Sequence, residues 1–194
     1  MGGRTFRSEW VWLPAIVAGI LAIHLPGLGN GLVFDDAPLA ETLFARYGTL
    51  AELHVRHLSY GTFPWLAALV GEGWWKQRLF NVLLHTGVVV ALWGLWREIL
   101  ARIAPAEGET GPVDYPNAPA LGIAIGFFAI NPVAVYAVAY LIERSILMAT
   151  LFVVVGLWLF LRGLATGRWP WFAAALACYP LAIASKEHAI LAPL

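Results

Sequence analysis

Five stretches of this chain are apolar over much of the length that a bilayer requires, and polar residues gather between them. They occupy residues 10–28, 79–96, 118–130, 146–161 and 169–184. A membrane-spanning helix needs about 20 mostly apolar residues, and the third stretch can be lengthened by the apolar residues that follow Pro132. The pattern predicts an all-α fold, a polytopic membrane helix bundle that forms a single transmembrane domain over residues 1–194.

The two ends of the chain refine this prediction. The first stretch is interrupted by Pro14, His24 and Pro26 and lacks an Ala-x-Ala pattern, whereas a signal peptide has a shorter apolar core and a small-residue cleavage site. We therefore expect a retained first span. After Glu187 the chain becomes apolar again up to Leu194, like the opening of a sixth helix, so we expect a chain truncated at its C-terminus.

The connection over residues 29–77 is too apolar for a solvated linker. Leucines there alternate with charged residues, which predicts short helices in the membrane interface. Residues 62–70 are too short to span and could be interfacial or re-entrant, and Trp74-Trp75-Lys76 is typical of an interface anchor. Residues 104–119 predict a flexible connection. Asn131-Pro132 predicts a helix break, followed by a short interfacial helix over residues 133–141.

Composition supports the membrane assignment. Hydrophobic residues make up 60% of the chain and charged residues 12%, with ten tryptophans, as expected for an integral membrane protein. The net charge is zero, which gives a nucleic-acid partner no electrostatic support. Cys178 is the single cysteine, so the chain has no internal disulfide and no thiolate metal site.

Orientation was judged from the basic residues that flank the spans. With a cytoplasmic N-terminus, that side holds Arg4, Arg7, Arg97, Arg102, Arg162 and Arg168, and the other side holds Arg46, Arg56, Lys76, Arg78, Arg144 and Lys186. The numbers are equal, but four residues of the second set lie beside acidic or polar neighbours, whereas the first set is typical of flanking charge, so we favour a cytoplasmic N-terminus. Residues 35–36, 131–144 and 185–188 then share the non-cytoplasmic face, which predicts a functional site there.

Asp35 and Asp36 are the strongest candidates for chemistry. A carboxylate near the interface can act as a general base or hold a metal ion. The alternative is helix capping, since Asp36 precedes Ala37-Pro38 and would begin a helix that continues to about Arg46. Both interpretations stay open.

Arg78, Asn81 and His85 are spaced to share one face of the second span, and such a polar stripe should face protein instead of lipid. It could bind a phosphate or sugar headgroup. Alternatively, Arg78 reaches the interface while the other two form hydrogen bonds between helices, which we favour for His85.

Two further polar groups remain ambiguous. Arg144 could bind a phosphate with its fork of donors, or could merely flank a span together with Glu143. Lys186 and Glu187 could take part in a site or form an ordinary charged turn. No Gly-rich phosphate loop, nucleophile elbow or His/Cys zinc spacing occurs in the chain.

Taken in order, several short motifs resemble a known family. They are Phe34-Asp35-Asp36, Leu58-Ser59-Tyr60, residues 78–85, Asn131-Pro132-Val133 with residues 137–140 and Arg144, and Ser185-Lys186-Glu187. The set resembles the N-terminal part of the GT-C fold glycosyltransferases, in particular the tetratricopeptide-containing transmembrane O-mannosyltransferases and their bacterial counterparts. No single motif is specific, but five occur in the right order between Asp35 and Glu187.

This resemblance implies a multi-span enzyme that uses a polyprenyl-phosphate-linked sugar. Interfacial helices of the first outer loop would surround a catalytic acid, which matches Asp35 or Asp36 and would deprotonate an acceptor hydroxyl on a protein or glycan, with inversion. By position, Arg78, Arg144 and Lys186 would bind the lipid phosphate, with Asn81 and Glu187 beside them. A divalent metal is possible. The location would be the bacterial plasma membrane, with the site facing the periplasm or exterior.

The chain also departs from the family pattern. Gly61-Thr62 stands where relatives often have Arg-Pro, and Asn131, Ala134 and Tyr136 occupy places where many have His or Glu, so acceptor or metal contacts there are in doubt. Relatives are also much longer. The alternative is a non-catalytic multi-span protein, either transporter-like or an assembly partner, or an inactive fragment. Charges at span ends, not at the midplane, argue mildly against transport.

Overall fold

Every regular element in the described part of the chain is a helix. The computed structural model describes residues 6–37, 42, 46–47, 54–103 and 118–192. The elements are α1 (Phe6–His24), η1 (Leu25–Gly27), α3 (His57–Val70), α4 (Trp74–Ile103), α5 (Ala118–Ile130), α6 (Pro132–Ala139), η2 (Leu141–Glu143), α7 (Arg144–Thr166), α8 (Trp169–Ser185) and η3 (Glu187–Leu191). The all-helical prediction is confirmed for these residues.

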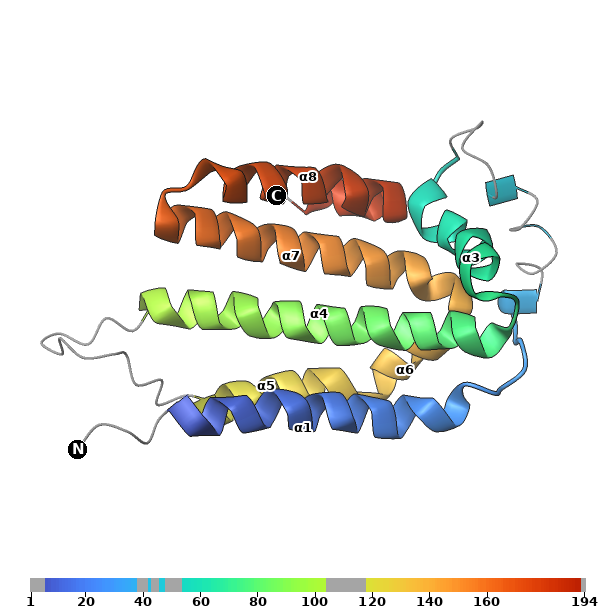
Figure 1. Ribbon diagram of the computed structural model, residues 1–194, viewed down its shortest axis with the longest axis horizontal. Coiled ribbons are helices and arrows are strands. Elements are labelled where there is room, and N and C mark those ends of the chain that lie inside the picture. Colours follow the sequence, from blue (N-terminus) through green and yellow to red (C-terminus); the bar gives the residue numbers. More distant parts are fainter. Residues whose placement is uncertain (1–5, 38–41, 43–45, 48–53, 104–117, 193–194) are drawn as a thin grey trace, which may run out of the picture.

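Five helices run side by side and α3 lies across one end of them (Figure 1). α1 packs against α5, α4 packs against α7, and α7 packs against α8. The chain changes direction at each turn, so residues after α1, before α4, after α5, before α7 and after α8 all meet at the end where α3 lies (Figure 1). This end, which we call the α3 end, collects the polar residues that the sequence separates.

Two helices are long and apolar enough to cross a membrane. They are Trp74–Leu100, with 27 residues, and Leu141–Thr166, with 26. A third candidate is the pair Pro119–Ile130 and Pro132–Ala139, bent by 52° at the break. Val11–Gly27 and Trp169–Ser185 are apolar but shorter. Within the described ranges, the structure therefore supports two or three spans by length, and the predicted total of five stays a prediction.

Local sequence explains most of the helix boundaries. Asn131 accepts a hydrogen bond from the Val133 backbone N–H at 2.9 Å, and Pro132 occupies the first turn of α6, where a missing N–H is harmless. The predicted break is therefore confirmed. α4 is longer than the predicted 79–96, since Trp74 opens it and Glu98 pairs with Arg102 one turn on, a spacing that favours helix.

Other predictions fall partly outside the described residues. Of the helix expected over residues 36–46, residues 36–37 and 42 are helical and 46 follows in another helical turn, while residues 38–41 and 43–45 are not described. The flexible connection expected over 104–119 is likewise undescribed up to residue 117. The expected sixth helix begins as the 3-10 helix η3, and residues 193–194 are not described.

Close helix packing depends on glycine, and the contacts are tightest at Gly122 and Gly94. A Cβ atom at Gly122 would lie 2.4 Å from the Trp12 ring, and one at Gly94 would lie 2.6 Å from the Trp158 ring. Helices in lipid associate through such small residues, since the backbones can approach closely. The contacts join α5 to α1 and α4 to α7, so each large ring fills a gap that its neighbour leaves open.

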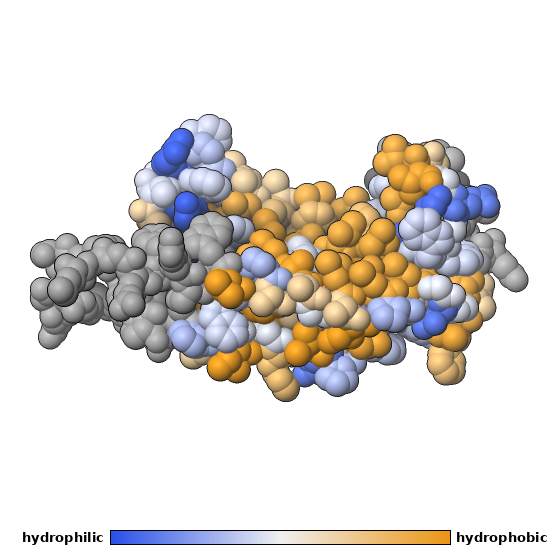
Figure 2. All heavy atoms as spheres, turned by 60° about the horizontal axis from the view of Figure 1, so that its bottom comes forward, coloured by the Kyte–Doolittle hydropathy of each residue, from blue (hydrophilic) through white to orange (hydrophobic). Residues whose placement is uncertain are grey.

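The lateral surface of the bundle is apolar. Figure 2 shows orange residues across the middle of one side of the molecule and blue residues mainly toward its two ends. Ile123 and Phe127 on α5 are 63% and 71% exposed, which suits a helix that faces lipid. On this side of the molecule, most of the strongly hydrophilic residues therefore lie toward the two ends.

Candidate functional site at the α3 end

The two adjacent aspartates point in opposite directions. Asp36 is 1% exposed, and its carboxylate accepts the backbone N–H groups of Leu141 and Ile142 at 3.1 and 3.0 Å. These are free donors at the start of η2, so Asp36 caps a helix that is 105 residues away in sequence. Capping was the alternative interpretation of Asp36, but the capped helix is different from the one expected.

Asp35 stays at the surface. Its carboxylate side chain is exposed, while its backbone N–H donates to the Tyr140 hydroxyl at 3.0 Å. The preceding Phe34 has a left-handed backbone, with φ of 48°, which costs a bulky residue about 1–3 kcal/mol. This turn inserts Asp36 into the protein and presents Asp35 outward. Of the two candidates for a general base, Asp35 alone is accessible in this conformation.

Arg144 lies at the centre of a buried polar cluster. It is 0% exposed, and its guanidinium donates to Asn81 Oδ1 at 2.8 Å, Thr62 Oγ1 at 3.1 Å and the Gln77 carbonyl at 2.8 Å. The group also lies 3.6 Å from the centre of the Phe63 ring, a cation–π contact. The cluster joins α3, α4 and α7 through a single side chain.

The side chains of Asn81 and Arg78 also form hydrogen bonds within the protein. Asn81 donates its amide to the Val138 carbonyl at 3.2 Å. Arg78 donates to the carbonyls of Leu28, Asn30 and Gly31, and so fixes the segment after α1. The expected role of these residues and of Arg144 in phosphate binding stays a prediction, and the three side chains are buried, with Asn81, Arg78 and Arg144 0%, 4% and 0% exposed. In this conformation a lipid phosphate cannot reach them.

His85 follows the interpretation that we favoured for it. Its Nε2 lies 2.9 Å from the Ala129 carbonyl on α5, and its ring contacts His24 of α1, with ring centres 5.9 Å apart. It is 2% exposed. His85 therefore links three helices and offers no surface to a ligand.

Lys186 and Glu187 contact two different segments. Lys186 Nζ lies 3.8 Å from Glu143 Oε2, while Glu187 forms a two-point ion pair with Arg56, at 2.8 and 2.5 Å. The Ser59 hydroxyl adds a hydrogen bond to the Ser185 carbonyl at 2.8 Å. These contacts hold the end of α8 against α3 and η2. Together with the contacts of Asp35 and Asp36 with residues 140–142, they join the three regions that the sequence predicted to share one face.

The ion pair changes the acidity of Glu187. Hydrogen bonds from the Arg56 guanidinium lower the pKa of Glu187 to about 2, and the same contact raises the pKa of Arg56. Because 53% of the Glu187 side chain is exposed, solvent screens this pair and its contribution to stability is small. Its effect is to keep Glu187 ionised at pH values between about 2 and 4.5, where an unpaired glutamate would be protonated.

Three contributors were missed by sequence reasoning. Arg56 and Glu143 looked like ordinary flanking charges, and Tyr140 was noted only as part of a motif. Arg56 stands two residues before Leu58-Ser59-Tyr60, and its side chain also donates to the Tyr60 hydroxyl at 3.1 Å. The adjacency of Arg56 to that motif was the available signal, whereas nothing in the sequence pairs Glu143 with Lys186.

Metal binding finds no support in the described residues. Within them, no group of three or more His, Cys, Asp or Glu side chains is placed to hold a metal ion. A divalent metal would need ligands from the substrate or from residues outside the described ranges.

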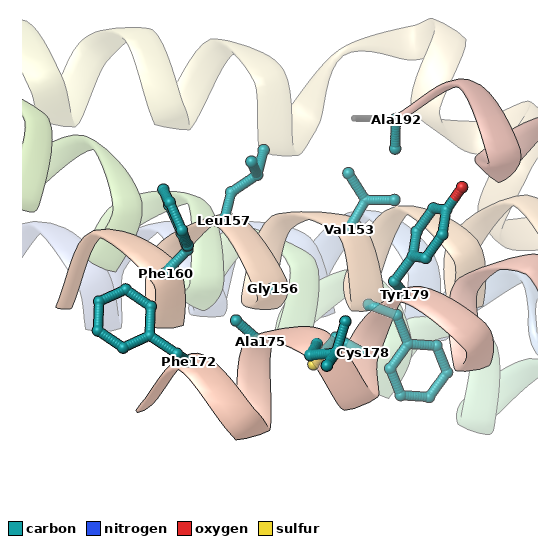
Figure 3. A pocket seen from close by; sticks show the side chains of 11 residues that line it. Val153, Gly156, Leu157, Phe160, Phe172, Ala175, Cys178, Tyr179 and Ala192 are labelled. Carbon is teal, nitrogen blue, oxygen red and sulfur yellow. The ribbon is translucent and has the colours of Figure 1, made fainter. Parts of the chain in front are cut away.

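An apolar groove of about 380 Å³ lies between α7 and α8, away from the polar cluster. Phe160 and Phe172 lie at one end and Tyr179 at the other, with Gly156 and Cys178 between them (Figure 3). The Tyr179 hydroxyl donates to the Ile190 carbonyl at 2.9 Å. Apart from this hydroxyl and the Cys178 thiol, the side chains that line the groove are apolar, so it suits hydrocarbon.

Comparison with known proteins gave no match: no family model, no curated protein and no solved structure is similar to this chain.

Proposed function

We propose that this chain acts as a GT-C-type membrane glycosyltransferase. It transfers a sugar from a polyprenyl-phosphate donor to an acceptor hydroxyl on the non-cytoplasmic face of the membrane. The observation that carries the proposal is that the separate motifs that resemble that family gather at the α3 end, where the carboxylate of Asp35 is accessible.

Asp35 acts as the general base in this mechanism. The acceptor hydroxyl gives its proton to Asp35 while its oxygen attacks the anomeric carbon. The bond between that carbon and the phosphate oxygen breaks, and polyprenyl phosphate leaves with the electron pair. Attack opposite the leaving group inverts the anomeric configuration. A positioned base of this kind contributes about 10²–10⁴-fold to a rate.

Phosphate recognition falls to the cations that remain near the surface. The Lys186 side chain is 16% exposed, and its Nζ lies as far as 3.8 Å from Glu143 Oε2. A phosphate could therefore replace Glu143 as the partner of Lys186. Arg56 is 29% exposed beside Glu187. Arg78 and Arg144 instead support the site from below, by holding the segment after α1 and the start of α7. The apolar bundle supplies contact with membrane lipid.

Orientation follows from the opposite end of the bundle. Arg102 and Arg162 there share Glu98 as a partner, and Arg168 is exposed. A surplus of exposed arginine is typical of the cytoplasmic side. The α3 end would then face the periplasm or exterior of a bacterial plasma membrane in a multi-pass arrangement.

The test is transfer by the full chain reconstituted in liposomes with a panel of tritiated undecaprenyl-phosphate-linked sugars. We expect sugar release or transfer with inversion, and a loss of at least about 100-fold in Asp35→Asn. Glu72→Gln is the matched control, because Glu72 is an exposed carboxylate at the same end. Full activity in Asp35→Asn, or equal losses in both variants, would contradict the proposal.

A non-catalytic assembly partner is the second candidate. It is favoured by the buried cluster, in which Arg144 donates to the Asn81 side chain and to the Gln77 backbone carbonyl and so joins helices without needing a substrate. Absence of sugar transfer by the wild-type chain, together with co-purification of a defined membrane partner, would support this candidate.

A further inference from the structure

Three aromatic rings from distant parts of the chain gather beside Asp35. Phe34 and Tyr140 have ring centres 6.4 Å apart, and Tyr140 stacks on Tyr136 at 5.3 Å with 24° between the ring planes. Phe34 is 83% exposed and Tyr136 is 61% exposed. We call this surface, made of Phe34, Asp35, Tyr136 and Tyr140, the aromatic ledge.

Membrane anchoring does not account for the aromatic ledge. Interfacial tyrosines commonly serve as anchors, but an anchor requires neither a left-handed backbone at Phe34 nor a hydrogen bond from the Asp35 N–H to the Tyr140 hydroxyl. Strained backbone of this kind is often found where a ligand is bound. The turn holds an apolar ring and a free carboxylate side by side at the surface.

The chemistry of the aromatic ledge suits a ligand with one apolar face and a polar rim. A pyranose ring has this character, because its C–H groups can pack on an aromatic ring while its hydroxyls donate to carboxylates. Asp35 offers such an acceptor, and Glu143 lies beside the Tyr136 hydroxyl. Tyrosine combines a large apolar surface with a polar tip, which serves such mixed contacts.

A cationic headgroup is the competing ligand, since aromatic cages bind quaternary ammonium groups. A cage needs ring faces directed at a common centre. Here Tyr136 and Tyr140 stack on each other, so each covers one face of its neighbour and the pair presents a flat surface. A flat surface matches a sugar ring better than it matches a spherical cation.

We propose that the aromatic ledge is the sugar-binding surface of this protein, on which a pyranoside stacks with a hydroxyl directed at Asp35. The inference rests on the proposed function, because it names the sugar subsite of the same reaction. Binding and transfer can nevertheless be measured separately.

The experiment measures binding of methyl α-mannopyranoside and methyl β-glucopyranoside by saturation-transfer NMR. The full chain is held in nanodiscs of phosphatidylglycerol and phosphatidylethanolamine, which contain no sugar. We expect millimolar binding that Tyr136→Ala weakens by about threefold to tenfold. Tyr136→Phe keeps the ring and should retain most of the binding. Trp169→Ala is the control, since Trp169 is a 75% exposed aromatic residue at the opposite end.

The outcomes separate the two proposals. Binding that depends on Tyr136 without sugar transfer would support the aromatic ledge and oppose the glycosyltransferase. Sugar transfer that is unaffected by Tyr136→Ala would support the glycosyltransferase and oppose the aromatic ledge. The inference is overturned if neither pyranoside binds, if Tyr136→Ala and Trp169→Ala weaken binding equally, or if tetramethylammonium binds at the aromatic ledge in preference to the sugars.

Discussion

The buried cluster around Arg144 and the surface around Asp35 lie at the same end of the bundle, yet the polar groups of the first are enclosed by protein and those of the second are exposed. The guanidinium of Arg144 donates to Asn81, Thr62 and Gln77 and has no exposed surface. The carboxylate of Asp35 is exposed, and only its backbone N–H is bonded to Tyr140. A charged residue in an apolar chain is thus not by itself a reactive residue, because the fold can use it to join helices.

The largest expected effect tests the buried side of this comparison. Arg144→Leu removes the donor shared by α3, α4 and α7 and leaves buried acceptors without partners. We expect the free energy of unfolding to fall by about 3 kcal/mol, because more than one buried acceptor loses its donor. Urea unfolding in detergent, followed by circular dichroism, measures it. Arg162→Leu, whose side chain is 49% exposed at the opposite end, should cost below about 1 kcal/mol. Equal costs would remove the distinction between the two arginines.

The two aspartates give the next largest effect. Asp36→Ala leaves the N–H groups of Leu141 and Ile142 buried and unpaired, so we expect a loss of about 2–3 kcal/mol in stability. Asp36→Asn should cost less, because its amide oxygen still accepts a hydrogen bond. Asp35→Ala is the matched change on the exposed side and should stay within about 0.5 kcal/mol. The same unfolding measurement compares all three, and a costlier Asp35→Ala would reverse our assignment of roles.

A smaller effect is expected at Phe34. Its φ of 48° is costly for a bulky side chain but not for glycine. Phe34→Gly should therefore leave stability unchanged or raise it by up to about 1 kcal/mol, while pyranoside binding weakens. Val33→Gly, at the preceding position without a positive φ, should instead lower the melting temperature. A clear destabilisation by Phe34→Gly would show that the ring contributes to folding.

The smallest effect concerns the Arg56–Glu187 ion pair. The pKa of Glu187 is lowered from its ordinary 4.5 to about 2, so the pair stabilises the fold fully above pH 4.5 and loses this contribution as the pH falls toward 2. Because the pair is largely exposed, it contributes at most about 1 kcal/mol. Stability measured at pH 6 and about pH 3 should fall less in Arg56→Ala than in wild type, and 1 M salt should reduce that difference. If Arg56→Ala and wild type lose the same stability between pH 6 and about pH 3, the pH dependence comes from other titratable groups.

The sequence by itself determined the helical class, the third helix with its break at Asn131-Pro132, and the gathering of polar residues at helix ends. These features depend on local information, since apolar length, a proline and a capping side chain act within a few residues of themselves. The alternation of helix direction then brought residues 35–36, 131–144 and 185–188 to the α3 end.

Only the tertiary structure decided which polar residues stay accessible. Asp35 and Asp36 are chemically identical neighbours, but the partners of Asp36 lie 105 and 106 positions away, and those of Arg144 lie 63–82 positions away. A sequence pattern reports composition and spacing, whereas burial and hydrogen bonding depend on segments that meet after folding. For that reason the sequence predicted that the polar residues gather at one end of the bundle. It could not predict which of them are exposed there and which are buried.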